Sequence, residues 1–262
     1  MEEKKLPSLF VSHESPMMWD TPSPAQAFLK NLAARLPKCK AVLVVSAHWQ
    51  APEFRVSAVS KPKMIYDFGG FGEHYYEVKY PASGSPPVAQ QVRELLAQQG
   101  IASAVDQNRG LDHAVWIPIG LMFPKANIPV VSLSIKFKGS PEEHFAAGQA
   151  LKELRRQGVL IVGSGTATHN RRALFSGGIP AVNAEPDAGA QEFSQWLIDH
   201  ANDRNAIIDY KKSAPSANHH HPTPDHFMPF IVAMGAGDGD PAECLHQSFN
   251  YSHFAMTSFS WG

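Results

Sequence analysis

Cysteine is scarce in this chain, with 2 residues in 262 against 13 histidines. Cys39 and Cys244 stand far apart, and no C-x-x-C pair occurs. A cysteine-rich zinc module and a disulfide scaffold are therefore excluded, and we interpret both residues as free thiols in a reducing compartment. The abundance of histidine leaves an imidazole-based metal site open.

Net charge is also nearly absent, because 23 Lys and Arg residues oppose 24 Asp and Glu residues. The chain therefore has no field of one sign that would attract nucleic acid or an anionic membrane. No apolar run reaches the roughly 18 residues that a membrane helix needs, and residues 1–7 lack the long apolar stretch of a signal peptide. We expect a cytoplasmic protein that acts on a small molecule, with neither nucleic acid nor a membrane as partner.

Several local motifs of catalysis are missing. The helical H-E-x-x-H zinc pattern, the phosphate-binding G-x-G-x-x-G and Walker loops and the G-x-S-x-G nucleophile elbow do not occur. The ligands of any metal site must therefore come from distant strands and loops.

Short apolar runs rich in β-branched residues alternate with segments of helical periodicity. The expected strands are Ser8–Ser12, 41–47, 54–59, 130–135 and 159–163, and the expected helices are 24–36, 87–99, 141–157 and 188–201. Runs without polar alternation are typical of parallel strands buried on both faces. Since no linker divides the chain, we predict an α/β fold: one three-layer αβα domain over residues 1–262, around a mostly parallel mixed sheet.

Two further segments bear on the position of a site. A last helix is expected to begin at Thr223-Pro224-Asp225, with Thr223 as cap, which would place His226 in its first turn. The segment 66–87 is long, aromatic and rich in Gly and Pro, and its aromatic content favours an ordered functional cover over disorder.

Three histidines directly follow strand-like runs or the turns after them: His13, His48 and His169. Ligands of open α/β sheets bind beyond the carboxyl ends of the strands, so these side chains and His226 are expected to converge there. Each one alone is more typical of a structural histidine at a strand end, and it is the convergence of three at one edge, with His226 nearby, that favours a site. Neutral imidazole binds Zn and Fe(II), and three such ligands with open positions suit a redox iron.

The N-H-H-H-P-T-P-D-H segment is the densest group of imidazoles. We interpret His219 and His220 as parts of a solvated loop, whereas His221 and His226 bracket a turn and are better site candidates. Asp225 is a rival carboxylate ligand, although a role as the acid at a helix N-terminus is favoured.

Asp112 and His113 follow a turn and place an acid beside an imidazole. A surface turn and a supporting role in catalysis are equally compatible with this pair.

Several blocks of the sequence, taken in order, match a known pattern. They are F-V-S-H with S-P-M (residues 10–17), V-V-S-A-H-W (44–49), Y-D-F-G-G-F (66–71), R-G-L-D-H (109–113), G-S-G with T-H-N (163–165 and 168–170) and H-P-T-P-D-H (221–226). Together they resemble the DOPA 4,5-dioxygenase-like family of class III extradiol ring-cleavage enzymes, in the LigB superfamily. The match runs nearly from end to end, and the ordered set is highly specific.

This resemblance implies a metal site made of His13, His48 and His226, with Fe(II) as the active metal and Zn(II) as an ion that can also occupy it. His169 resembles the family's acid/base histidine beside the metal, which can become a fourth ligand to zinc when substrate is absent. His113 resembles the histidine that faces dioxygen and substrate.

The implied activity is that of an oxidoreductase that opens the ring of a catechol, DOPA or a related diol, with O2. His221, Phe68 and Phe71 are expected in the substrate pocket, although ordinary loop packing is equally open for the two phenylalanines. Two alternatives remain: a zinc hydrolase that uses the same histidines to activate water, and a non-catalytic binding protein like the Memo proteins of the superfamily.

Glu14 departs from the family pattern, which usually has glycine after the first ligand. A glutamate at this position can reshape the pocket, repel an anionic substrate or reach the metal itself. The identity of the substrate is what this residue puts in question.

Overall fold

An eight-stranded sheet forms the centre of the molecule in the computed structural model, which describes residues 5–176 and 178–262. Its strand order is β4-β3-β5-β2-β6-β1-β10-β7. The strands are β1 (Ser8–Ser12), β2 (Ala41–Ala51), β3 (Phe54–Ser57), β4 (Ser103–Asp106), β5 (Val130–Lys136), β6 (Val159–Gly165), β7 (Ala242–His246) and β10 (Ser258–Trp261). A separate two-stranded ladder joins β8 (Phe249–Asn250) and β9 (Phe254–Ala255).

The middle of the sheet is parallel and its margins contain antiparallel pairs. Strands β5, β2, β6 and β1 run parallel to one another, whereas β3 pairs antiparallel with β5, and β10 pairs antiparallel with β1. The prediction of a mostly parallel mixed sheet is therefore confirmed, and all five expected strands are present. The strand expected at 41–47 continues to Ala51.

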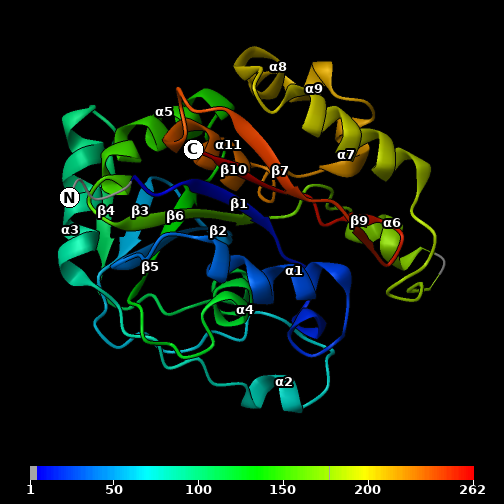
Figure 1. Cartoon of the computed structure of the whole chain (residues 1–262), viewed down its shortest axis with the longest axis horizontal. Coiled ribbons are helices and arrows are strands. Elements are labelled where there is room, and N and C mark those ends of the chain that lie inside the picture. Colours follow the sequence, from blue (N-terminus) through cyan, green and yellow to red (C-terminus); the bar gives the residue numbers. More distant parts are fainter. Residues whose placement is uncertain (1–4, 177) are drawn as a thin grey trace.

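Helices cover both faces of this sheet, as Figure 1 shows for α4 on one side and α5 with α11 on the other. One apolar core packs α1 (Pro24–Leu32) and α4 (His113–Met122) against one face. The second core packs α3 (Pro86–Gln98), α5 (Pro141–Leu151), α7 (Ala188–His200) and α11 (Met228–Ala236) against the other. The shorter helices are α2 (His74–Glu77), α6 (Arg171–Phe175), α8 (Arg204–Ile208), α9 (Tyr210–Ser213) and α10 (Ala217–His220), with 3-10 turns at Pro16–Trp19, Ala33–Arg35 and Lys152–Arg155. The three-layer αβα prediction is confirmed.

Successive residues of a central strand belong alternately to the two apolar cores. Val42 and Val44 of β2 belong to the core under α1 and α4, and Leu43 and Val45 belong to the opposite core. Side chains of a strand alternate between the two faces, so a run without polar residues is what a sheet covered on both sides requires.

The four expected long helices are present, and serine side chains cap three of them. Ser23 accepts from the Gln26 amide at the start of α1, and Ser140 forms a reciprocal capping box with Glu143 at the start of α5. The predictions 24–36 and 141–157 are too long for single α-helices, because each segment passes into a 3-10 turn near its end.

The expected start of the last helix is wrong. Helix α11 begins at Met228, and the preceding residues form a turn in which the Phe227 amide donates to the Pro224 carbonyl. Pro229 occupies the first turn of the helix, where its missing N–H costs no hydrogen bond. His226 therefore lies in the turn before the helix.

Two glycines of β6 bring this turn against the sheet. A Cβ on Gly163 would stand 2.1 Å from the Pro229 carbonyl oxygen, and one on Gly165 would stand 2.1 Å from the His226 carbonyl oxygen. No larger residue fits at either position without moving backbone. The absence of side chains there lets His226 lie at the strand ends.

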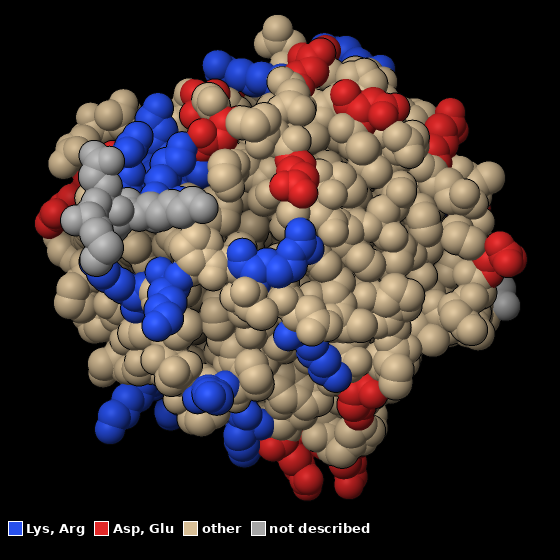
Figure 2. All heavy atoms as spheres, in the orientation of Figure 1, with Lys and Arg blue, Asp and Glu red and all other residues tan. Residues whose placement is uncertain are grey.

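The surface carries both signs of charge. On the face in Figure 2, acidic and basic side chains both occur and are separated by wide uncharged areas. Cys39 and Cys244 are free thiols, as interpreted from their spacing. None of the described helices is long and apolar enough to cross a membrane.

Candidate metal centre

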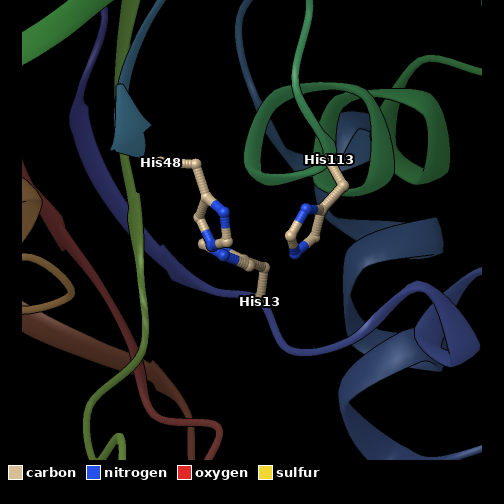
Figure 3. Close-up of side chains that lie close together, drawn as sticks. All are labelled: His13, His48 and His113. Carbon is tan, nitrogen blue, oxygen red and sulfur yellow. The ribbon is translucent and has the colours of Figure 1, made fainter. Parts of the chain in front are cut away.

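Five imidazoles gather at the carboxyl ends of β1, β2 and β6. The ring centroid of His48 lies 5.3 Å from that of His13, 5.0 Å from that of His226 and 4.0 Å from that of His113. His169 stacks on His226, with ring centroids 3.5 Å apart. The sequence-based expectation that these side chains converge at one sheet edge is met in the geometry, and Figure 3 shows His13, His48 and His113 facing a common space.

Local structure sets the direction of each ring. His13 follows β1 directly, and its backbone amide donates to the Gly165 carbonyl at 2.7 Å. His48 lies where the pairing of β2 with β5 shifts register, between Ser46 and Gln50, and such irregularities redirect side chains. His113 is the first residue of α4.

In His13, His48 and His226, the outer ring nitrogen is Nδ1, and it donates a hydrogen bond to an acceptor outside the imidazole cluster. His48 Nδ1–H donates to Asp67 Oδ2 at 2.9 Å, and His226 Nδ1–H donates to Asp225 Oδ2 at 2.5 Å. His13 Nδ1–H donates at 2.9 Å to Ser164 Oγ, whose own proton goes to the Ala114 carbonyl. Carboxylates only accept, so the proton of each ring is placed on Nδ1 and the lone pair on Nε2.

The inner nitrogens are the Nε2 atoms of the same three rings, and they carry lone pairs rather than protons. His48 Nε2 and His226 Nε2 are 3.1 Å apart, and His13 Nε2 is buried with no hydrogen-bond partner. Lone pairs that face each other in this way repel unless a cation lies between them. Two imidazole nitrogens bound to one tetrahedral zinc ion at about 2.0–2.1 Å would stand about 3.3 Å apart, close to the separation found here. The donor set therefore suits a metal ion.

Two groups of potential ligands overlap at this place. The ligand atoms of His13, His48 and His113 lie within 4.8 Å of one another, and so do those of His169, Asp225 and His226. The contact between His48 and His226 joins the two groups. Both groups together contain every histidine that the resemblance placed at the metal or beside it, namely His13, His48, His113, His169 and His226.

Burial keeps these rings in the form that binds metals. Desolvation, followed by the neighbouring imidazoles, lowers the pKa of His13 and of His226 well below the ordinary histidine value. Burial also lowers the pKa of His169 to about 4, against the opposing effect of Asp225. A metal ligand must be unprotonated, so no proton has to be displaced from these rings at neutral pH.

Asp67 is the functional residue that sequence reasoning overlooked. Besides binding His48, it accepts through Oδ1 from the His113 backbone amide at 3.0 Å and from His113 Nδ1–H at 2.8 Å. Burial would raise the pKa of Asp67, but the hydrogen bonds from His113 and His48 lower it overall. The Y-D-F-G-G-F block contained this aspartate, and its position between two aromatic residues of a covering segment was the available signal.

Asp225 holds a ring in place as well. The sequence left it open as a rival ligand or as the acid of a helix N-terminus. Its Oδ2 instead accepts from His226, and the helix begins three residues later. The short turn before α11 therefore carries both an inner imidazole and the carboxylate that orients it.

A cavity of about 350 Å³ opens beside the histidines. Its lining consists of Glu14, Ser15, Pro16, His48, Tyr66, Asp67, Phe68, Gly69, Phe71, His113, Thr166, His169, Arg171, Leu174, Phe175, His226 and Phe254. Phe68 and Phe71 belong to the covering loop, which we define as residues 58–85 between β3 and α3. A larger open groove runs along α7, but neither described group of potential ligands lies there.

His221 and His220 lie outside this cavity. The structure places His221 in the core, where its Nε2–H donates to the Ala167 carbonyl at 2.8 Å and its ring packs on Phe193 and Phe227. His220 is buried as well, against Phe193, and is not part of a solvated loop. The aromatic surface of α7 and of the turn before α11 covers both rings.

Glu14 lines the cavity and is only 6% exposed. Neither of its carboxylate oxygens has a hydrogen-bond partner. Burial raises the pKa of Glu14 to about 8, with a smaller opposing effect from the Asn250 side chain. Glu14 belongs to neither group of potential metal ligands in the described chain.

Comparisons with known proteins agree with this geometry. Residues 7–260 match the family model described as the catalytic LigB subunit of aromatic ring-opening dioxygenase. A "4,5-DOPA dioxygenase extradiol" of Beta vulgaris is 39% identical over 263 residues, which cover 96% of each chain. A protein of the same name from Escherichia coli K12 is 34% identical and covers 100% of this chain and 97% of its own.

A solved structure shows the same fold. An uncharacterised protein from Escherichia coli K12 superposes with a TM-score of 0.81 at 29% identity, over 98% of this chain and 100% of the other. The full-length matches favour an enzyme over the non-catalytic alternative. The chain belongs to the LigB family of aromatic ring-opening extradiol dioxygenases, which makes it an oxidoreductase of that class.

Proposed function

We propose that the chain opens the ring of a catechol with O2 and that His13, His48 and His226 hold the Fe(II) ion on which this activity depends. The same three nitrogens suit Zn(II) as an alternative occupant. The observation that carries the proposal is the convergence of three Nε2 lone pairs whose Nδ1 protons are fixed by outside acceptors. When bound, the metal would supply the Lewis acidity and electron transfer that allow a catechol and dioxygen to react.

His169 is the proposed acid/base group. Its imidazole lines the cavity, and stacking on His226 fixes the plane of its ring. Because burial keeps it neutral, it is ready to accept a phenolic proton from a catechol in the cavity. It can also serve as a further zinc ligand when substrate is absent.

We propose that His113 interacts with the negative charge that develops on oxygen during the reaction. Since its Nδ1–H donates to Asp67, its Nε2 carries a lone pair at the cavity wall. Burial lowers the pKa of His113, and the Asp67 carboxylate opposes this shift by stabilising the protonated form of the ring. His113 is thus placed to take a proton and to return it to an oxygen atom of the product.

The apolar wall is proposed to hold the aromatic ring of the substrate and to exclude water. Phe68 and Phe71 pack edge to face, with centroids 5.7 Å apart, and Phe254 and Leu174 line the cavity beside them. Aromatic side chains hold a planar ring through offset and edge contacts.

Anaerobic reconstitution with Fe(II) tests this function. With DOPA, caffeate or protocatechuate as substrate, we expect oxygen uptake and a yellow ring-opened semialdehyde. A Zn(II)-loaded sample is the matched control and should take up no oxygen. Hydrolytic activity with zinc and independence from oxygen would support the zinc hydrolase instead, and silence of the verified iron form with every catechol would overturn the proposal.

A further inference from the structure

His48 and His113 come from different elements, and their rings lie against each other. His48 is in the irregular stretch of β2, and His113 is the first residue of α4. The ring centroids are 4.0 Å apart at an interplanar angle of 71°, and Figure 3 shows the two side chains facing a common space. Because the backbone carries each ring, the contact between the end of β2 and the start of α4 sets the distance between them.

Asp112 lies at this contact. It directly precedes α4, at a position where an aspartate side chain usually caps the helix. The Asp112 side chain makes no capping hydrogen bond, and the amide of His113, the first of the helix, donates to Asp67. The sequence left open whether Asp112 belongs to a surface turn, and its complete burial excludes that interpretation.

The Asp112 carboxylate has one partner for each oxygen. Its Oδ1 accepts from Ser46 Oγ at 2.8 Å, and its Oδ2 accepts from the Arg109 guanidinium at 2.5 Å. A buried carboxylate needs a cation and hydrogen bonds to offset the loss of its hydration. Arg109 supplies the positive charge from a side chain that is only 20% exposed. The carboxylate therefore ties the start of α4 to β2.

Both partners of Asp112 lead back to the stretch that carries His48. Ser46 Oγ accepts from the His48 backbone amide at 3.1 Å, where β2 leaves its regular pairing with β5. This hydrogen bond satisfies an amide in the interrupted part of the ladder. The Arg109 guanidinium lies over the Trp49 ring, with Cζ 5.0 Å from the ring centroid. Asp112 is thus connected to residues on both sides of His48.

The ion pair of Arg155 with Asp240 is a useful comparison, because it has no such connection. The Arg155 guanidinium also donates to three backbone carbonyls, those of Leu6, Ala236 and Trp261. Leu6 precedes β1, whereas His13 follows it, so this pair joins chain segments at the end of the strand away from the imidazoles. The pair of Arg109 with Asp112 instead joins the two segments that carry His48 and His113.

We propose, on the basis of the function proposed above, that Asp112 is a positioning residue that sets the place of His113 against His48 and thereby against the metal and the catechol. Asp112 does not line the cavity and belongs to neither described group of potential ligands, so it acts through the backbone of α4 and β2. Arg109 is part of the same arrangement, because it holds the carboxylate. Displacement of a reacting group by about 1 Å can lower a rate about 100-fold.

Asp112→Asn and Arg109→Met test this role from the two sides of the ion pair. The asparagine keeps an oxygen acceptor for Ser46, and the methionine keeps an apolar stem on Trp49. Each Fe(II)-loaded variant should bind iron stoichiometrically and bind DOPA, caffeate and protocatechuate anaerobically like the wild type. Its kcat should fall about 10- to 100-fold. The double variant should lose no more than the larger single loss, because both residues act through one pair.

The NMR signal of the His113 Nδ1–H in the Zn(II)-loaded protein gives a second readout that needs no turnover. In the wild type this proton should exchange slowly with water, because the ring is buried and the proton is bound to Asp67. It should exchange faster in both variants, since the ring is no longer held in place. Asp203→Asn is the matched control: Asp203 caps α8 and has no contact with the cluster, so kcat and the His113 signal should not change.

The outcomes separate the two proposals. Wild-type kcat, or an unchanged His113 signal, in either folded variant would overturn the role of Asp112. Loss of iron from both variants would also overturn it, because the pair would then support the metal ligand and not His113. Failure of the iron-loaded wild type with all three catechols would overturn the function itself, while the His113 signal would still test how Asp112 places the ring.

Discussion

The molecule has two regions rich in histidine, and they do opposite things. The strand-end cluster of His13, His48, His113, His169 and His226 comes from segments far apart in sequence. The run from His219 to His221 is contiguous, and its two buried members pack against the aromatic surface of Phe193. The densest segment, residues 218–226, supplies one member of the cluster, His226, while its contiguous run His219–His221 lies elsewhere, so density of imidazoles alone does not mark the site.

The hydrogen bonds explain the contrast. In the strand-end cluster, carboxylate and hydroxyl acceptors take the outer proton and leave the inner lone pair free. The Nε2–H of His221 donates to a backbone carbonyl, and its Nδ1 is buried without a hydrogen-bond partner. A ring of the first kind is ready for a cation, whereas one of the second kind holds two segments of backbone together.

Among the variants that test this comparison, His48→Ala is expected to have the largest effect on iron binding and on kcat. Loss of one of three ligands should abolish stoichiometric iron binding and reduce kcat by more than about 100-fold, which exceeds the usual effect of losing an outer hydrogen bond. His169→Ala should keep the iron and still lose about 10²- to 10⁴-fold in kcat, as expected for a missing acid/base group. Metal analysis and oxygen uptake distinguish the two variants, and the reverse pattern would mean that their roles are exchanged.

A smaller effect is expected for Asp67→Asn. The amide cannot replace the negative charge that fixes His48 and His113, so metal affinity should fall about 10- to 100-fold. Competition with a chelator measures this affinity. Glu77→Gln, at an exposed position of the same loop, is the control and should bind metal like the wild type. Equal affinities of the two variants would show that Asp67 does not support the centre.

The smallest effect on the metal is expected in the contiguous run. His221→Ala removes a fully buried ring and its hydrogen bond to Ala167, and should lower the free energy of unfolding by about 2–4 kcal/mol. The folded variant should still bind metal stoichiometrically. His219→Ala, at an exposed position, should change stability by less than about 0.5 kcal/mol. Urea unfolding and metal analysis check both, and loss of metal from folded His221→Ala would break the distinction between the two regions.

The pattern of apolar residues along the sequence predicted much of the fold. The apolar runs predicted the strands, and the proline-led periodic segments predicted the long helices, because burial on both faces and local capping leave direct patterns. The start of α11 did not follow, since Thr223-Pro224 and Phe227 with Pro229 are both acceptable helix starts locally. Packing of Gly165 against the His226 carbonyl, a contact between distant segments, decides between them.

The site was predictable only in part for the same reason. Strand ends indicated His13, His48 and His169, but spacing gave no means to find Asp67 as their partner, because the covering loop has no periodicity that fixes its path. The burial of His220 and His221 was missed because a polar, proline-flanked run reads as solvent-exposed, and the aromatic residues that cover it belong to other segments.

Asp67 belongs to the covering loop and yet binds two imidazoles of the centre. Any motion that lifts the loop also withdraws the acceptor that fixes those rings. Loop position and metal occupancy would then be linked equilibria, and such linkage is reciprocal. A ligand that held the loop over the centre would tighten metal binding by the same factor by which the metal tightened binding of that ligand.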